Sequence, residues 1–364
     1  MSQRARAISF FLPQYHPFPE NDRHWGTGFT EWNNVVRARP LFPGHHQPQL
    51  PADLGFYDLR VPEVRAQQRD LALAAGIEAF ALYHYWFHGR RLMQRPIEEF
   101  FADPPHEVRY LLCWANESWT LEWRGRDDVA TLEQTYSPED DAAHAEHLAA
   151  YFANERYYRL DGKAVFLVYN PHHLPDAKAT VDVLRSAAAR VGVELLLGGC
   201  VAFAEDVDVR EWGLDFSVRW APNWLTIQRA PDERREKLMK LESKLLAKRW
   251  PRFRNNTVYD YARVRDAHVA TPRPAWPTCE SAFPSWDNTA RRAHGDAIIV
   301  TEPTPDGFEQ WLRSIVARQR PQDPPLVFVN AWNEWAEGCH LEPDDRWGHE
   351  WLNRCRAVFG AAAH

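Results

Sequence analysis

The chain has 364 residues, and 45% of them are hydrophobic, which is enough to bury a large core and excludes a disordered or fibrous protein. Its formal net charge of -7 argues against a nucleic-acid-binding surface, which needs a clustered excess of Lys and Arg. Its 17 tryptophans favour half-exposed rings that line a cleft, where flat sugar faces stack, although most of the rings are expected in the core.

Short apolar runs alternate with amphipathic stretches along the chain, which is the pattern of β/α units around a parallel sheet. Eight runs are predicted as strands: Ala7–Leu12, Ala79–Tyr83, Tyr110–Trp114, Ala164–Tyr169, Glu194–Gly198, Asp215–Val218, a weak run Pro277–Phe283, and Leu326–Asn330. Six stretches are predicted as helices: Val61–Ala75, Asp140–Phe152, Ala177–Val191, Pro231–Leu246, Pro305–Ala317, and His349 to about Phe359.

Eight strands with intervening helices predict an α/β fold, a (β/α)8 TIM barrel. We expect one domain over residues 1–364, with long βα loops. A doubly wound open sheet is the alternative, but the sequence has no GxGxxG or Walker A loop to support it.

Polar and aromatic residues crowd the C-terminal ends of several predicted strands. In a barrel these ends converge on one mouth, where the active site lies, so the pattern predicts a carbohydrate-binding site there. The predicted substrate-binding residues at strand ends are His84, Tyr85, Trp86, Trp114, Asn116, Glu117, Tyr169, Trp332 and Asn333.

Two carboxylates, Glu334 and Glu337, follow the last predicted strand three residues apart. In a helical turn such residues become neighbours, and Gly338 would help to end the turn. Glycoside cleavage needs one carboxylic acid and one carboxylate, and a close pair favours retention of configuration. A surface helix start, at which two glutamates favour the helix dipole, is the alternative, and spacing alone rates the two interpretations as even.

Three further carboxylates are candidates for the mouth. Glu117 could bind hydroxyl groups or act in catalysis, or it could pair with Arg124 or Arg126. Asp287, after Trp286, is a turn residue or a hydroxyl ligand, and Glu31 lies in the first long loop.

The histidines and cysteines show no metal or disulfide pattern. The 16 histidines form no HExxH or Cys/His finger spacing, and no GxSxG elbow occurs, so we expect no metal and no cofactor. The five cysteines are widely spaced without CxxC, which favours free thiols in a reducing compartment. The apolar stretch near the N-terminus is shorter than that of a signal peptide, and no apolar run reaches transmembrane length. A cytoplasmic protein is therefore expected.

Motifs in order along nearly the whole chain resemble the WbsX-like proteins, which are related to glycoside hydrolase family 99. They are Phe11-Leu12-Pro13-Gln14-Tyr15-His16, Thr30-Glu31-Trp32-Asn33-Asn34-Val35, Gln47-Pro48, Leu54-Gly55-Phe56-Tyr57, His84-Tyr85-Trp86-Phe87, Cys113-Trp114-Ala115-Asn116-Glu117-Ser118-Trp119, Trp286-Asp287-Asn288-Thr289-Ala290-Arg291-Arg292, and residues 330–338.

This resemblance implies a (β/α)8 barrel that acts on glycosidic linkages. The Glu-Trp-x-Glu motif of family 99 would make Glu334 the base that deprotonates the sugar 2-hydroxyl, giving a 1,2-anhydro intermediate, and Glu337 the acid and then the base. Ala336 stands where family 99 usually has His, and Tyr15 falls where the family places a substrate-contacting Tyr. The WbsX-like branch is associated with surface polysaccharides such as O-antigen lipopolysaccharide, and is often labelled glycosyltransferase.

Three hypotheses follow, each with an oligo- or polysaccharide as partner and with the oligomeric state undetermined. The first is a retaining glycoside hydrolase or transglycosylase that acts on a mannose-like or related unit. The second is a nucleotide-sugar-dependent glycosyltransferase, which needs a diphosphate site; Arg90, Arg91, Arg291 and Arg292 are the candidates, though surface roles are the simpler expectation. The third is a non-catalytic glycan-binding barrel, in which the two glutamates would lie too far apart to share one sugar.

Overall fold

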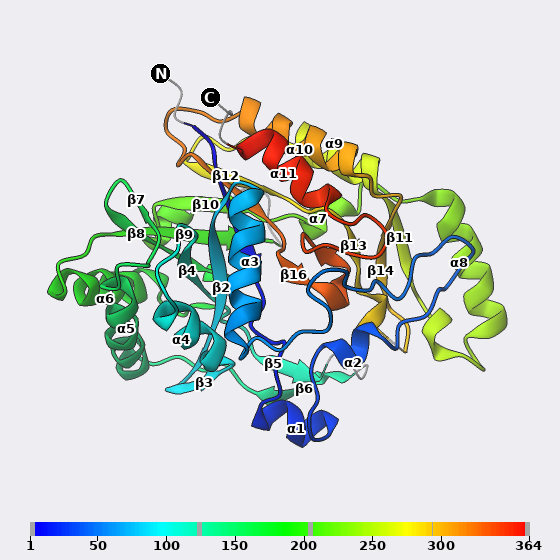
Figure 1. The fold of residues 1–364 in the computed structure, drawn as a ribbon, viewed down its shortest axis with the longest axis horizontal. Helices are drawn as coiled ribbons and strands as arrows, with labels where there is room; N and C mark the ends of the chain where they lie inside the picture. The colour runs from blue at the N-terminus through cyan, green and yellow to red at the C-terminus, as the bar shows by residue number, and fades with distance from the viewer. Residues whose placement is uncertain (1–3, 122–125, 203–206, 293, 361–364) are drawn as a thin grey trace.

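The computed structural model describes residues 4–121, 126–202, 207–292 and 294–360. Eight parallel strands in these ranges form a closed barrel. Figure 1 shows the sheet with helices around it. The order is β1-β15-β12-β10-β9-β8-β4-β2, and pairing of β2 with β1 closes the barrel. The predicted TIM-barrel fold is therefore confirmed. The strands are β1 (Arg6–Phe11), β2 (Ile77–Phe87), β4 (Arg109–Trp114), β8 (Lys163–Val168), β9 (Leu195–Val201), β10 (Phe216–Arg219), β12 (Thr278–Ala282) and β15 (Leu326–Val329).

All eight predicted strands are present, with shifted ends. The largest difference is β2, which runs to Phe87 because its last residues pair with the antiparallel strand β3 (Arg90–Leu92). Even the weakly patterned run before Phe283 forms β12, whose five residues are all buried between β10 and β15.

The six predicted helices form, with local signals at several ends. Ser137, Asp176 and Thr304 accept backbone N–H groups at the N-termini of three of them, as capping residues do. The helices are α3 (Pro62–Ala74), α5 (Pro138–Phe152), α6 (Ala177–Arg190), α8 (Glu233–Leu246), α10 (Pro305–Ala317) and α11 (Glu350–Phe359).

Two helices of the barrel were not predicted, α4 (Gln94–Ala102) and α9 (Tyr261–Ala270). Pro96 suggests a break in α4, but proline is tolerated in a first turn, where the N–H groups lack helical partners. In α9 only Tyr261 and Val264 are buried, so the apolar periodicity is weak.

The connections carry short elements. They are α1 (Pro19–Trp25), α2 (Trp32–Val35), α7 (Trp224–Ile227), β5 (Trp119–Leu121), β6 (Arg126–Leu132), β7 (Arg159–Leu160), β11 (Thr257–Asp260), β13 (Trp286–Asp287), β14 (Ile298–Thr301), β16 (Asn333–Glu334), β17 (Cys339–His340), and the 3-10 helices η2 (Pro171–His173), η3 (Val209–Trp212), η4 (Pro251–Phe253), η5 (Asn288–Ala290) and η6 (Trp335–Glu337).

The helix α8 differs from the other predicted helices because it projects away from the barrel, at the right of Figure 1. Met239 is its only buried residue. A second small core joins this side chain to the sheet β11-β14-β13 through Leu41, Phe253, Val258, Ala297 and Ile299.

The barrel interior below the C-terminal ends of the strands is filled by aromatic rings. Phe10 is fully buried, with its ring centroid 4.5 Å from that of Trp220, 5.5 Å from Phe328 and 5.8 Å from Tyr83. These rings form a packed floor, so a ligand can enter only from the mouth. Within the described ranges, no helix combines the length and apolar character needed to span a bilayer.

Candidate active site

A pocket of about 250 Å³ lies at the mouth of the barrel. Its lining comes from the C-terminal ends of the strands and the connections that follow them, where TIM-barrel active sites lie. The lining residues are Leu12, Gln14, Tyr83, Tyr85, Ala115, Glu117, Ser118, Trp119, Tyr169, Trp220, Trp224, Trp286, Arg291, Asn330, Glu334 and Glu337.

The segment after β15 coils tightly, as its sequence predicted. Glu334 ends the short strand β16, and residues Trp335–Glu337 form the 3-10 turn η6 before β17 returns antiparallel. Gly338 ends the turn in the left-handed region with φ 56°, and a Cβ atom there would lie 2.7 Å from Nε2 of Gln49. The backbone nitrogen of Asp287 would lie 3.1 Å from the same Cβ atom, so glycine is favoured at this position.

The side chain of Arg291 joins three carboxylates at one edge of the pocket. Its Nη1 donates to Oε1 of Glu337 at 2.5 Å, and its Nη2 donates to Oε2 of Glu334 at 2.8 Å. Its Nε and Nη2 also donate to Glu31, which is completely buried. Because Glu334 and Glu337 contact two nitrogens of one guanidinium, their carboxylates lie side by side and within reach of one sugar ring.

One guanidinium carries too little charge to neutralise three carboxylates. Burial raises the pKa of the Glu334 carboxyl well above its ordinary value, the Arg291 cation opposes this, and the charges of Glu337 and Glu31 add to the rise. The group therefore retains a proton at a pH where an exposed glutamate is ionised. A carboxyl tuned in this way is suited to proton transfer near neutral pH.

Aromatic side chains form much of the remaining pocket wall. The rings of Trp224 and Trp286 meet edge to face with centroids 5.4 Å apart, and Tyr169 meets Trp220 in the same way at 5.1 Å. Burial raises the pKa of Tyr85 above its ordinary value, so its hydroxyl stays protonated. The wall thus offers apolar ring faces together with hydroxyl donors, the combination that a sugar requires.

A buried carboxylate behind the pocket, Glu342, holds in place the segment that carries Glu334 and Glu337. It accepts hydrogen bonds from Nε1 of Trp332 at 2.8 Å and Nε1 of Trp335 at 2.7 Å. Tyr57 donates to it at 2.8 Å and Gln68 at 2.6 Å. Burial raises the pKa of Glu342 to about 7, against the effect of these four donors.

Three residues predicted to bind substrate belong to this supporting layer and do not line the pocket. Trp332 is buried against Glu342, and the hydroxyl of Tyr15 accepts from the backbone N–H of Trp335 at 3.1 Å. The side chain of Asn333 accepts from the backbone N–H of Leu12 at 2.8 Å and donates to the backbone C=O of Leu12 at 3.0 Å. They act through the backbone that carries Glu334 and Glu337.

Three more predicted residues, at the ends of β2 and β4, are buried outside the pocket lining: His84, Trp86 and Trp114. His84 and His144 approach through their Nε2 atoms at 3.0 Å, and burial lowers the pKa of His84 to about 3. Trp86 donates to Asp140 at 2.9 Å, and Trp114 packs edge to face on His144.

Two more predicted contacts, Asn116 and Asp287, shape loops. Asn116 bridges the backbone N–H and C=O of Asn170, each at 2.7 Å. Asp287 accepts from Gln47 at 2.7 Å and contacts Nε2 of His45 at 2.5 Å.

The remaining predicted residues reach the pocket or its edge. Tyr85, Glu117, Tyr169, Trp286, Glu334 and Glu337 line it, and Glu31 lies behind it on Arg291. Glu117 accepts from Nδ2 of Asn170 at 2.8 Å. Arg124 lies outside the described residues, as does the side chain of Arg126.

Several lining residues were not singled out as site residues from the sequence. Trp220 and Trp224 follow the end of β10, so the rule of polar and aromatic residues at strand ends applies to them. The sequence suggests Arg291 only for a diphosphate site or, as the simpler expectation, for a surface role. The structure instead buries its side chain among carboxylates. Arg90 and Arg91 pair with Glu20 and Glu98 and do not line the pocket.

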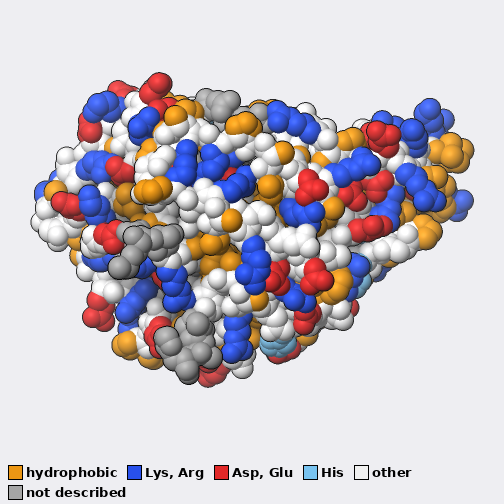
Figure 2. Space-filling model, turned by 90° about the horizontal axis from the view of Figure 1, so that it is seen from above, with side chains coloured by type: hydrophobic (Ala, Val, Ile, Leu, Met, Phe, Trp, Pro, Cys, Tyr) orange, Lys and Arg blue, Asp and Glu red, His pale blue; other side chains and the backbone are white. Residues whose placement is uncertain are grey.

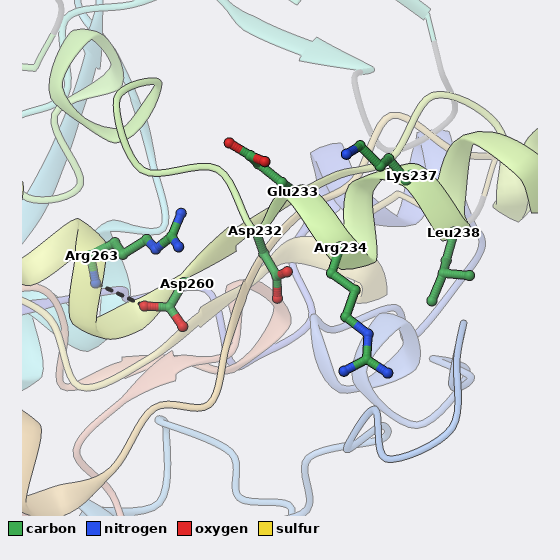
Figure 3. A pocket seen from close by; sticks show the side chains of 7 residues that line it. All are labelled: Asp232, Glu233, Arg234, Lys237, Leu238, Asp260 and Arg263. Atoms are coloured by element: carbon green, nitrogen blue, oxygen red, sulfur yellow. Dashed lines mark hydrogen bonds between the residues drawn. The ribbon is translucent and has the colours of Figure 1, made fainter.

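A larger hollow, of about 620 Å³, lies at the start of α8 (Figure 3). It is lined by three cations and three carboxylates with Leu238, and no aromatic ring contributes to it. Because it shares no residue with the mouth of the barrel, it is separate from the carboxylate pair. Among the described residues, no group of three or more His, Cys, Asp and Glu side chains is placed to hold a metal ion.

Comparison with known proteins identifies the same family as the motifs. The family model described as glycosyltransferase WbsX matches residues 7–355. A relative named "uncharacterized protein WxcX", from Xanthomonas campestris pv. campestris strain B100, is 39% identical over 361 residues, 98% of this chain and 50% of the relative. The chain thus spans about half the length of the curated relatives it matches.

Solved structures with the same fold include a glycoside hydrolase-like protein and a glycoside hydrolase. A glycoside hydrolase-like protein superposes with a TM-score of 0.64 at 15% identity, covering 99% of this chain and 95% of the other. The GH99 endo-alpha-mannosidase from Bacteroides thetaiotaomicron superposes with a TM-score of 0.54 at 13% identity, covering 98% and 99%. At these identities the likeness concerns the fold.

Replacing Glu342 with Gln tests the supporting layer. The amide NH₂ of the new glutamine cannot accept hydrogen bonds from the donors that now contact the carboxylate of Glu342. We therefore expect the free energy of unfolding to fall by about 1–3 kcal/mol for each donor left unpaired. Urea denaturation at neutral pH measures it. Glu63→Gln, an exposed change on α3, serves as the control and should alter stability by less than about 0.5 kcal/mol. Equal stability of the two variants would contradict the supporting role.

Replacing Arg291 with Gln tests the charge balance. Three carboxylates, of which Glu31 and Glu334 are buried, then lose their cation, and we expect a destabilisation of about 3–5 kcal/mol near neutral pH. Loss of the cation disfavours the ionised carboxylates in the folded state, so the loss of stability should grow as the pH rises and shrink as the pH falls and the carboxyls protonate. Urea denaturation at several pH values measures this. Arg91→Gln, which removes a half-exposed pair with Glu98, should cost less than about 1 kcal/mol at every pH.

Proposed function

The chain belongs to the WbsX glycosyltransferase family, whose members are carbohydrate-active proteins, and on this basis we propose that it is a retaining glycoside hydrolase or transglycosylase. One observation carries the proposal: Glu334 and Glu337 share a guanidinium in an aromatic pocket at the mouth of the barrel. The proposed substrate is a mannose-like or related unit of a surface polysaccharide. The five buried free thiols support action in the reducing cytoplasm.

The proposed reaction has two steps. Glu334 accepts the proton of the sugar 2-hydroxyl while O2 attacks C1, and the departing glycosidic oxygen takes the proton of Glu337. In the second step water or an acceptor hydroxyl attacks C1 and gives its proton to Glu337. The bond between C1 and O2 then breaks, and O2 regains its proton from Glu334. Two inversions at C1 give net retention, and the nature of the attacking hydroxyl separates hydrolysis from transfer.

The charge of the pocket supports this chemistry over a nucleotide-sugar mechanism. Arg291 is the one cation among the described lining residues, and three carboxylates already contact it. With Glu117 also in the lining, the pocket is negative overall, which opposes the binding of a diphosphate. A non-catalytic glycan-binding barrel would require the two glutamates to lie apart, and the shared guanidinium holds them together.

Glu334→Gln and Glu337→Gln test the proposal directly. Each should lower kcat by about 10²–10⁴-fold on an oligosaccharide of the surface polysaccharide, because each removes a group that transfers a proton. Glu63→Gln is the matched control and should retain full activity. Reducing-end release and product anomer, followed by NMR, give the rate and the stereochemistry. Full activity of either variant, or an inverted product, would refute the proposal.

Ligand binding separates the two classes of enzyme. Calorimetry should show a mannose-configured iminosugar binding to the protein, with binding weakened in Glu334→Gln. A nucleoside diphosphate should give no measurable heat. Tight binding of the nucleoside diphosphate with no response to the iminosugar would favour the glycosyltransferase.

The pH profile tests the role of Glu334. As a base it works only when ionised, and burial raises its pKa. We therefore expect kcat/KM to fall as the pH decreases through a value well above that of an exposed glutamate. A profile of kcat/KM against pH measures this limb. Activity that rises towards low pH through the same range would assign Glu334 as the acid instead.

A further inference from the structure

The outer face of α8 carries an apolar stripe that no other part of the described chain covers. Leu238, Leu241 and Leu245 are 54%, 55% and 70% exposed. Their spacing of three and four residues places them on one side of the helix. Trp250, just beyond the helix, is 40% exposed and lies beneath the guanidinium of Arg249. Single exposed leucines are common, but an aligned set on a projecting helix is not.

Basic side chains surround this stripe. Residues 233–254 hold nine Lys and Arg against three glutamates, although the whole chain has a net charge of -7. Arg234, Lys237, Lys244 and Lys248 are exposed and lie three or four residues from the leucines. Figure 3 shows Arg234 and Leu238 on the same side of the helix, with Lys237 on another. In Figure 2 the projecting end at the right carries basic and apolar side chains together.

We propose that α8 docks this protein onto the surface of an anionic lipid bilayer. A helix with leucines on one face, flanking lysines and a tryptophan matches the chemistry of interfacial helices, which lie in the headgroup layer. The leucines would enter the boundary of the acyl chains, and the lysines would contact anionic headgroups from the flanks. The ring of Trp250 would sit at headgroup depth.

Charge argues against a second copy of this chain as the partner. A symmetric contact through α8 would bring two basic helices together, and like charges across an interface repel. The apolar stripe is equally unsuited to a phosphate backbone, which offers charge but no apolar surface. An anionic bilayer supplies both.

The position of α8 gives this surface a relation to the pocket. The helix lies in the connection that leaves the C-terminal end of β10, and the same connection places Trp220 and Trp224 in the pocket wall. A docked bilayer would therefore contact the segment that carries part of the pocket wall. The proposal itself does not depend on the reaction that the pocket performs.

Vesicle sedimentation with the full chain tests the proposal. The protein should bind vesicles of phosphatidylcholine mixed with phosphatidylglycerol and not vesicles of phosphatidylcholine alone. Binding should weaken as sodium chloride is added, because salt screens the headgroup charge. Equal binding to both vesicle types, or to neither, would overturn it.

Two sets of substitutions separate the apolar and the basic contributions. Lys237→Gln, Lys244→Gln and Lys248→Gln together should lower the partition coefficient on the order of a hundredfold, at about fivefold for each lysine. Leu238→Gln, Leu241→Gln and Leu245→Gln together should lower it at least about tenfold. The control Leu73→Gln changes a 41% exposed leucine on α3 and should leave binding unchanged.

All the substituted positions are exposed, so each variant should keep the circular dichroism spectrum and melting temperature of the parent protein. Full binding by either triple variant would refute the proposal. Light scattering tests the second copy as partner: if the leucine substitutions dissolve a dimer while vesicle binding is absent, α8 joins two protein chains and the bilayer proposal is wrong.

Discussion

Three carboxylates, two of them buried, depend on one guanidinium, and the geometry of the mouth depends on that contact. Glu31 comes from the loop after β1, Arg291 from the turn after β13, and Glu334 and Glu337 from the turn after β15. These three segments are distant from one another in sequence, so only the closed barrel brings the four side chains together. Without the cation, the three charges would repel one another. With it, the site still holds more acid than base, and burial together with this excess raises the pKa of Glu334.

The turn that carries the glutamates is held from behind by hydrogen bonds. Trp332 and Trp335 flank Glu334, and both donate their ring N–H groups to Glu342. Tyr15 contacts the backbone of Trp335, and Asn333 contacts that of Leu12. The reaction that we propose for Glu334 and Glu337 needs such support, because small displacements of reacting groups are costly. This accounts for aromatic and amide side chains in the motif that never reach the pocket.

The sequence predicted the architecture well because alternating apolar runs report burial, and burial determines where the strands lie. It also located the mouth and the coiled turn, since Glu334, Glu337 and Gly338 carry local signals. It did not distinguish lining residues from supporting ones. His84 and Tyr85 are adjacent at one strand end, yet His84 is buried against His144 while Tyr85 lines the pocket. Alternation along a strand sends neighbours to opposite faces, and which face meets the pocket depends on barrel register.

The sequence also did not reveal hydrogen-bond and ion-pair partners that lie far apart along the chain. Glu342 lies five residues after Glu337 in a polar segment, and no local pattern shows that two indole rings converge on it. Arg291 looks like a surface residue because Arg292 follows it and both lie among polar residues. Its role depends on the charge of residues from two other connections, and this balance exists only in the folded chain. The same logic applies to α8. The sequence predicted this helix as one of those between the barrel strands, whereas the structure turns three of its leucines outward, and only their basic surroundings then indicate what partner they suit.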